Sequence, residues 1–180
     1  MEIDRSRALT RAHCVTHFCN HSQPESGAHI ELGLPDEAAT RGFGARLARC
    51  VVPGFRLYLR GPLGSGKTTL VRGLLGGLGW RGRVKSPSYA LVELYVVSRL
   101  QLYHFDFYRF LDQGEWNDSG FRDSFDSAAV CVVEWPEKAG DALPPPDLEI
   151  VLEHAPAGRT LRAHAFSETG ERCLRGFTGG

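Results

Sequence analysis

The sequence predicts an α/β fold, a single domain in which helices flank a mixed β-sheet. A short apolar strand at Phe55–Leu59 runs into a glycine-rich turn that starts at Gly61, and a helical pattern follows over Thr68–Leu78. The continuous apolar run Ala128–Val133 is typical of a strand buried on both faces. The β-rich runs between residues 89 and 106 indicate a hairpin. Together these elements favour helices packed on a mixed sheet.

The helix expected before this unit begins after Asp36, whose side chain can accept hydrogen bonds from the free N–H groups of a first helical turn. Phe43 and Leu47 lie one helical turn apart and predict one buried face. Pro53-Gly54 then breaks the chain before the strand. Gly79 is expected to end the helix that follows the glycine-rich turn.

The second half of the chain predicts further strands. Residues Asp112–Phe125 are expected to form mostly helix or turn. Leu148–Leu152 and Thr160–Phe166 are expected to form two late strands joined by Ala157-Gly158. From Gly170 onward the composition is polar, and we expect a tail.

Chain-wide features bound the class of protein. Its 180 residues fit one domain, over residues 31–180, preceded by a polar and flexible extension over residues 1–30. Lys+Arg and Asp+Glu both number 21, which does not fit a bulk polyanion binder such as a general DNA-binding protein, although net charge does not report local patches. The odd number of cysteines, five, and the lack of a secretory signal predict reduced thiols in the cytoplasm. The apolar runs are too short for a membrane span.

Residues 61–68 match the phosphate-binding pattern G-x-x-x-x-G-K-[ST] at every fixed position. Glycines let backbone N–H groups turn toward an anion, and the helix that starts there adds the positive end of its dipole. Lys67 is expected to reach the β- and γ-phosphates, and the Thr68 hydroxyl to bind magnesium. The motif predicts a P-loop NTPase-like domain that binds ATP or GTP with Mg²⁺. The expected nucleotide contacts are Gly61, Leu63, Gly64, Ser65, Gly66, Lys67, Thr68 and Thr69.

Two carboxylates are candidates to complete this site. Asp106 and Glu134 each end an apolar strand, and strand ends line ligand crevices in open α/β sheets. Either could hold magnesium or position the attacking water as the Walker B acid, and the residues leave this choice open. The loop Lys85–Tyr89 has the hydroxyls and the proline of a segment that could respond to nucleotide, although its composition also fits an ordinary loop.

Beyond the P-loop, the chain resembles the TsaE (YjeE) family, bacterial ATPases needed to make threonylcarbamoyladenosine in tRNA. The resemblance runs from about Leu34 to about Arg175, and its most specific parts are the Ser-Pro-Ser-Tyr, His-Phe-Asp-x-Tyr-Arg and Glu-Trp-Pro sequences. The blocks that carry it are residues 34–40, 61–69, 84–89, 104–109 and 133–136.

The resemblance implies roles for matching residues. Lys67 would hold the phosphates, Thr68 and Glu134 would hold magnesium, and Asp106 would be the Walker B-type acid that acts on magnesium or on the attacking water. The implied catalytic residues are therefore Asp106, Glu134 and Lys67, and the implied metal ligands are Thr68, Asp106 and Glu134.

Four further positions follow from the resemblance alone. Glu37 and Thr40 would lie beside the nucleotide base, Trp135 would shape the site, and Arg159 would lie near the nucleotide. Ser88 stands where the family usually has threonine, which keeps the hydroxyl and should tune the site without removing its function.

The resemblance favours an ATPase that is slow alone and works with the partner proteins TsaB and TsaD. A small-molecule P-loop kinase is the alternative, because Asp106 and Arg109 are spaced like the acid–arginine pair of some kinases; the residues after Trp135, however, predict no lid helix. A binding module without hydrolysis is a third hypothesis, against which the intact P-loop and acids argue.

The lack of an Asn-Lys-x-Asp block favours ATP over GTP. Direct RNA contact is open, because the basic stretch Arg81–Lys85 also fits a solvated face.

Overall fold

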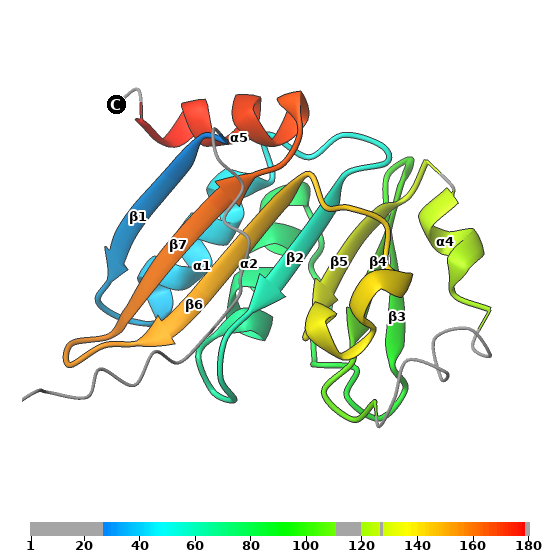
Figure 1. Ribbon diagram of the computed structural model, residues 1–180, viewed down its shortest axis with the longest axis horizontal. Helices are drawn as coiled ribbons and strands as arrows, with labels where there is room; N and C mark the ends of the chain where they lie inside the picture. The colour runs from blue at the N-terminus through cyan, green and yellow to red at the C-terminus, as the bar shows by residue number, and fades with distance from the viewer. Residues whose placement is uncertain (1–26, 111–119, 127, 179–180) are drawn as a thin grey trace, which may run out of the picture.

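The computed structural model describes residues 27–110, 120–126 and 128–178 (Figure 1). Seven strands form one mixed sheet in the order β1-β7-β6-β2-β5-β4-β3, with helices packed on it, as the sequence predicted. The strands are β1 (His29–Leu34), β2 (Arg56–Arg60), β3 (Val92–Val97), β4 (Leu100–Asp106), β5 (Val130–Glu134), β6 (Leu148–His154) and β7 (Arg159–Ala165). The helices are α1 (Glu37–Leu47), α2 (Lys67–Leu78), α4 (Arg122–Asp126) and α5 (Glu168–Thr178), with short 3₁₀ turns η1 (Pro136–Lys138) and η2 (Gly140–Ala142).

The centre of the sheet is parallel and its two sides are antiparallel. β2 pairs in parallel with β5 and β6, and β5 pairs in parallel with β4. The hairpin β3–β4 forms one side, and on the other side β7 pairs antiparallel with both β6 and the N-terminal strand β1. Because parallel strands bring their carboxyl ends to the same edge, the ends of β2, β4 and β5 meet there.

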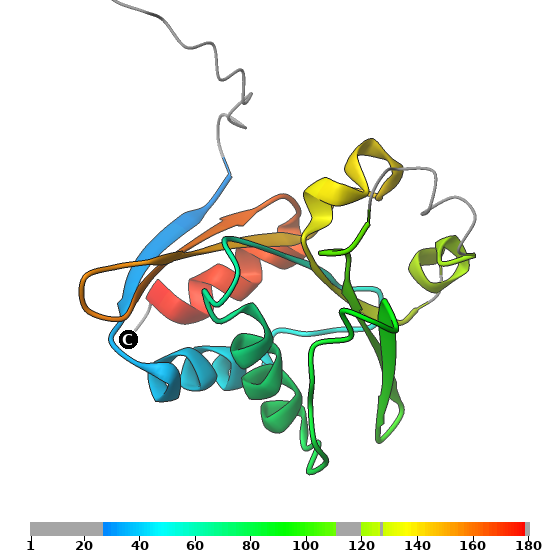
Figure 2. The ribbon, with the colours of Figure 1, turned by 90° about the horizontal axis from the view of Figure 1, so that it is seen from below.

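Both faces of the central strands are buried. Along β5, Val130 and Val132 join the core that lies under α1, α2 and α5, while Cys131 and Val133 join a second core on the opposite face. Figure 2 shows these three helices on the same side of the sheet. Every residue of β5 is buried, which confirms the prediction of a strand buried on both faces. The second core is mostly aromatic. Its members include Tyr58, Phe105, Phe107, Phe110 and Phe125.

Helices α1 and α2 approach each other closely because both carry glycine at the contact. A Cβ atom on Gly44 would lie 2.2 Å from the carbonyl oxygen of Leu70, and one on Gly73 would lie 2.1 Å from that of Arg41. The predicted N-cap of α1 is confirmed, since Asp36 accepts a hydrogen bond of 2.7 Å from the backbone N–H of Ala39. Backbone contact therefore fixes the position of α2, which carries the P-loop.

The prediction of a polar tail from Gly170 is wrong, because residues 168–178 form helix α5. Cys173 and Leu174 are buried in the main core, and Phe177 stacks on Phe43 of α1 with ring centroids 4.5 Å apart. These side chains share one face, while the charged residues that made the segment look like a tail point to solvent. Tertiary burial of that face stabilises a helix whose composition is polar.

We expect Phe177→Ala to lower the free energy of unfolding by about 1–3 kcal/mol, because it removes the ring that ties α5 to α1. Denaturant unfolding of the purified variant measures this change. The matched control is Arg172→Ala on the exposed face of α5, for which the expected change is under about 0.5 kcal/mol. Equal losses in both variants would contradict a docked α5.

Strand β1 was not predicted. It pairs with β7 over its whole length, from His29 opposite His164 to Leu34 opposite Arg159. Of the extension predicted at residues 1–30, residues 1–26 lie outside the described residues, and His29 and Ile30 belong to β1. Of the helix or turn predicted at 112–125, residues 112–119 lie outside the described residues, while Arg122–Asp126 form α4. In the described part of the chain, no helix combines the length and apolar character needed to cross a membrane.

The described cysteines Cys50, Cys131 and Cys173 are free thiols, in line with the sequence-based expectation of reduced thiols. Burial raises the pKa of the Cys131 thiol to about 12 and also raises that of Cys173. We therefore expect both thiols to be protonated at neutral pH and to react slowly with alkylating reagents in the folded chain.

Candidate functional site

The glycine-rich turn between β2 and α2 forms a cradle open to an anion. Gly61 has a φ of +127°, and a Cβ atom there would lie 2.0 Å from the carbonyl oxygen of Leu152, so only glycine fits. Gly66, with a φ of +106°, is the N-cap of α2 and offers no side chain to the first turn. The N–H groups at the start of α2 are therefore available to a phosphate.

Lys67 lies within this cradle, only 4% exposed. Its Nζ donates to the carbonyl oxygens of Gly61 at 2.6 Å and Pro62 at 2.9 Å, and lies 4.1 Å from the ring centroid of Trp135. Burial lowers the pKa of Lys67, and the nearby Glu134 carboxylate opposes this shift by favouring the charged form. Trp135 holds a left-handed backbone with a φ of 60°, which is rare for an aromatic residue and turns its ring toward the ammonium.

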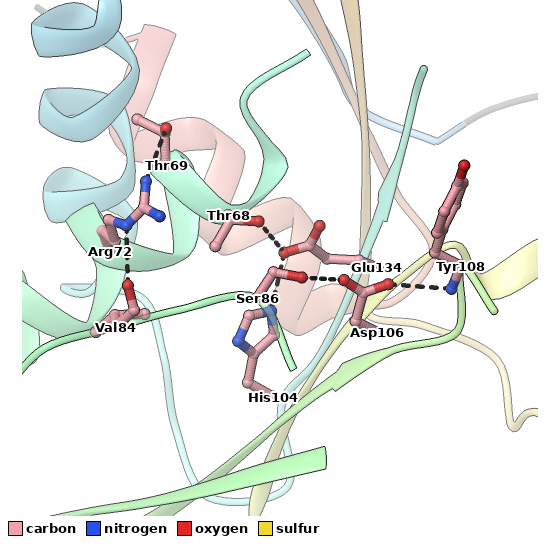
Figure 3. A network of polar contacts seen from close by, with 9 residues as sticks. All are labelled: Thr68, Thr69, Arg72, Val84, Ser86, His104, Asp106, Tyr108 and Glu134. Atoms are coloured by element: carbon pink, nitrogen blue, oxygen red, sulfur yellow. Dashed lines mark hydrogen bonds and ion pairs between the residues drawn. The ribbon is translucent and has the colours of Figure 1, made fainter. Parts of the chain in front are cut away.

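Glu134 lies at the carboxyl end of β5 and is bonded to the P-loop helix (Figure 3). Its Oε1 accepts a 2.9 Å hydrogen bond from the Thr68 hydroxyl, and the same oxygen lies 2.9 Å from Nε2 of His104. His104 is fully buried and Glu134 is 3% exposed. A hydroxyl and a carboxylate in contact beside a phosphate cradle are the oxygen ligands that Mg²⁺ takes in such sites.

Asp106 lies directly opposite Glu134 in the β4–β5 register. Its Oδ2 accepts a hydrogen bond from the Ser86 hydroxyl, and its Oδ1 accepts one of 3.0 Å from the backbone N–H of Tyr108 (Figure 3). The two candidate acids therefore have different partners. Glu134 is tied to the P-loop helix through Thr68, and Asp106 is tied to the loop at residues 84–89.

A cavity of about 340 Å³ opens between these groups. It brings together most of the predicted residues, namely Leu63, Gly64, Gly66, Lys67, Thr68, Thr69, Asp106, Glu134 and Trp135. Five predicted residues do not line it, namely Glu37, Thr40, Gly61, Ser65 and Arg159. A larger cavity of about 830 Å³ lies elsewhere, beside β6 and β7, and includes none of the predicted site residues.

Arg159 and Thr40 lie together on another side of the cradle. Arg159 Nη1 donates to Thr40 Oγ1 at 2.7 Å and to the backbone oxygen of Asp36 at 3.1 Å. A Cβ atom on Gly66 would lie 3.3 Å from Arg159 Nε, so this guanidinium is next to the P-loop. Glu37, the first residue of α1, is exposed.

These residues fit a phosphate chain with a divalent cation. The free amides at Gly66 and the ammonium of Lys67 suit phosphate oxygens, and Thr68 with Glu134 suits the cation. Two buried polar atoms near the cradle, Ser65 Oγ and Arg159 Nε, have no hydrogen-bond partner among the described residues, which leaves them available to a ligand.

The site and the fold together match one family over most of the chain. Residues 34–161 fit the profile of the family described as Threonylcarbamoyl adenosine biosynthesis protein TsaE. The chain belongs to the TsaE family. TsaE-family relatives named tRNA threonylcarbamoyladenosine biosynthesis protein TsaE include one from Haemophilus influenzae, 37% identical over 150 residues, which covers 81% of this chain and 95% of the relative.

A TsaE relative from Bacillus subtilis is 37% identical over 138 residues, covering 77% of this chain and 84% of the relative. The crystal structure of YdiB from the same species superposes with a TM-score of 0.74 at 28% identity, over 86% of this chain and 97% of YdiB. The predicted P-loop fold and the resemblance to TsaE are thereby confirmed.

Sequence reasoning had assigned no role to three residues of this TsaE-family site, namely His104, Arg72 and Tyr108. His104 was quoted within a motif, but its contact with Glu134 depends on strand pairing between β4 and β5. Its position two residues before Asp106 was the available signal, because residues i and i+2 of a strand share a face. Arg72 also lines the nucleotide cavity; it lies one helical turn after Thr68, which was a usable signal.

We expect His104→Ala to weaken Mg²⁺ binding about 10- to 100-fold, because Glu134 would lose one of the two groups that orient it. Mg²⁺ titration of nucleotide binding measures the effect, and a melting curve separates it from a loss of folding. His104→Gln keeps an amide donor and should recover part of the affinity. If both variants bind Mg²⁺ like the wild type, His104 does not orient Glu134.

Proposed function

We propose that this chain binds Mg-ATP at the P-loop and hydrolyses it as the ATPase subunit of tRNA threonylcarbamoyladenosine synthesis. The observation that carries the proposal is the contact between the Thr68 hydroxyl and Glu134, beside a phosphate cradle and opposite a second carboxylate, Asp106. The names of the TsaE relatives supply the pathway.

Each residue of the site has a separate role in binding or hydrolysis. Lys67 leaves its two carbonyl partners and pairs with the phosphates, and the amides at the start of α2 hold their oxygens. Thr68 and Glu134 hold the cation, and Asp106 is placed to join them or to orient the attacking water. Mg²⁺, when bound, neutralises charge on the phosphate oxygens. Thr40 and Arg159 support the cradle from the side of α1, where Glu37 would lie beside the base.

The loop at residues 84–89 is the element that reports the state of the site. Ser86 bonds to Asp106 at the strand end, and Ser88 lines the same cavity. A change at Asp106 on hydrolysis would release Ser86 and so alter the surface offered by this loop. TsaB and TsaD, in the cytoplasm, are the partners we propose to sense that surface and to stimulate hydrolysis.

The test is phosphate release from ATP by the purified chain, alone and with TsaB and TsaD. Lys67→Ala and Glu134→Ala should remove the stimulated rate, while Lys138→Ala, an exposed lysine just beyond Trp135, should leave it unchanged. An absence of stimulation with Mg-ATP still tightly bound would contradict the ATPase and leave a nucleotide-gated binding module. Membership of the TsaE family favours the ATPase over the small-molecule kinase.

A further inference from the structure

A third cavity, of about 500 Å³, lies beside α2 and the segment that follows it, and its lining is strongly basic. Five of its lining residues carry positive charge and none carries negative charge. The indole of Trp80 forms part of the wall. The five cationic residues are Arg41, Arg72, Arg81, Arg83 and Lys85.

These charges are not neutralised within the described part of the chain. None of the five forms an ion pair with a described residue, although Arg72 donates hydrogen bonds to neutral partners. The 830 Å³ cavity beside β6 and β7 provides the contrast. There Arg60 contacts Glu149 at 2.7 Å and Glu137 at 3.0 Å, and Arg162 contacts Glu153 at 2.7 Å. In a chain of zero net charge, the basic cavity is thus a local concentration of uncompensated cations.

The fold holds this cavity in place. Arg72 Nε donates to the backbone oxygen of Val84 at 3.0 Å, which ties the basic segment to α2 (Figure 3). Trp80 packs edge-to-face on Tyr95 with centroids 5.2 Å apart. Gly73 lets α1 approach α2, which brings Arg41 to the same place. The cationic residues therefore come from α1, α2 and the following segment, and they surround one concave surface.

We propose that this basic cavity is a second phosphate-binding site, separate from the P-loop, that takes the phosphate groups of an RNA chain; the choice of RNA rests on the proposed function. Four of the five cations are arginines, whose planar guanidinium matches two phosphate oxygens at once. An aromatic ring among basic residues suits a polynucleotide, since bases stack on it. The RNA named in the pathway of the relatives is tRNA. A free polyphosphate presents the same phosphate groups and is the alternative ligand.

The experiment measures binding of labelled tRNA, and separately of tripolyphosphate, to the full chain with its P-loop saturated by a non-hydrolysable ATP analogue. The variant is Arg81→Glu/Arg83→Glu, which leaves Arg72 intact because Arg72 also lines the nucleotide cavity. The control is Arg99→Glu/Arg172→Glu, which changes net charge equally at two exposed sites outside the cavity.

If RNA supplies the bound phosphate groups, the cavity variant should bind tRNA at least tenfold more weakly than the control. The slope of log affinity against log salt should become shallower by about 0.7–0.9 for each phosphate group that the variant no longer neutralises. If the variant loses only tripolyphosphate binding, the cavity is a phosphate site whose ligand is free polyphosphate and not RNA. Equal weakening in the variant and the control, or no binding of either probe, would overturn the proposal.

Nucleotide binding by the same samples separates the two proposals. The cavity variant should bind Mg-ATP and release phosphate like the wild type, since neither Arg81 nor Arg83 lines the nucleotide cavity. If nucleotide binding is intact and the RNA result is negative, only the second site fails. A wild-type chain that binds no Mg-ATP would instead refute the ATPase proposal.

Discussion

Glu134→Gln should lower partner-stimulated ATP hydrolysis about 100- to 1000-fold while the chain stays folded. Glutamine has the shape of glutamate, so it fits between Thr68 and His104, but it lacks the negative charge that balances a cation. Removal of one preorganised electrostatic interaction from a buried site has an effect of this size. Phosphate release at saturating ATP, over a range of Mg²⁺ concentrations, measures it.

Asp106→Asn is the matched comparison, because Asp106 lies opposite Glu134 but contacts Ser86 in place of Thr68. If Asp106 orients the water, its variant loses rate at every Mg²⁺ concentration, whereas excess Mg²⁺ should partly rescue Glu134→Gln. Rescue of Asp106→Asn alone would reverse the two assignments. Unchanged hydrolysis in Glu134→Gln would remove Glu134 from the site.

Gly73→Ala should lower the free energy of unfolding by about 3 kcal/mol, although alanine normally favours a helix. The added methyl group would lie 2.1 Å from the backbone oxygen of Arg41, so α1 and α2 would have to separate. Overpacking against a rigid backbone has an effect of this order. Denaturant unfolding monitored by circular dichroism measures the change.

Gly76→Ala is the control, one helical turn further along α2. Outside the neighbouring turns of α2 itself, no atom lies within 4 Å of a Cβ atom at Gly76, so the substitution should stabilise the chain by about 0.5–1 kcal/mol through helix propensity. Opposite signs for the same chemical change would show that backbone contact between the helices decides the outcome. Stabilisation by both substitutions would contradict the close packing of α1 on α2.

The P-loop, the buried strand β5 and the late strands could be predicted because each has a local pattern. Strand β1 also had one, the alternation of Ile30, Leu32 and Leu34, but its helix-start neighbour Asp36 and the polar residues before it obscured the pattern. Helix α5 depends on distant contact, since Phe177 stacks on Phe43. The spacing of Cys173, Leu174 and Phe177 on one helical face was a usable local signal for the helix, but its docking against Phe43 depends on residues far away in the sequence.

The candidate site divides in the same way. Lys67 and Thr68 follow from a contiguous motif, whereas the separate partners of Asp106 and Glu134 depend on the register of two strands and on the position of the loop that carries Ser86. The sequence could nominate both acids but could not distinguish them. The roles of Glu37, Thr40 and Arg159 are still predictions.

The cation over the Trp135 ring gives the chain a built-in optical probe. Indole emission responds to a charge held against the ring, and the Lys67 ammonium lies 4.1 Å from its centroid. A ligand that draws the ammonium toward its phosphates would change the colour or the intensity of that emission. Trp80, set against Tyr95 away from the nucleotide cavity, would add a background, and the emission of Trp116, outside the described residues, is removed by Trp116→Phe. Nucleotide affinity and exchange rates could then be followed in real time on the unlabelled chain.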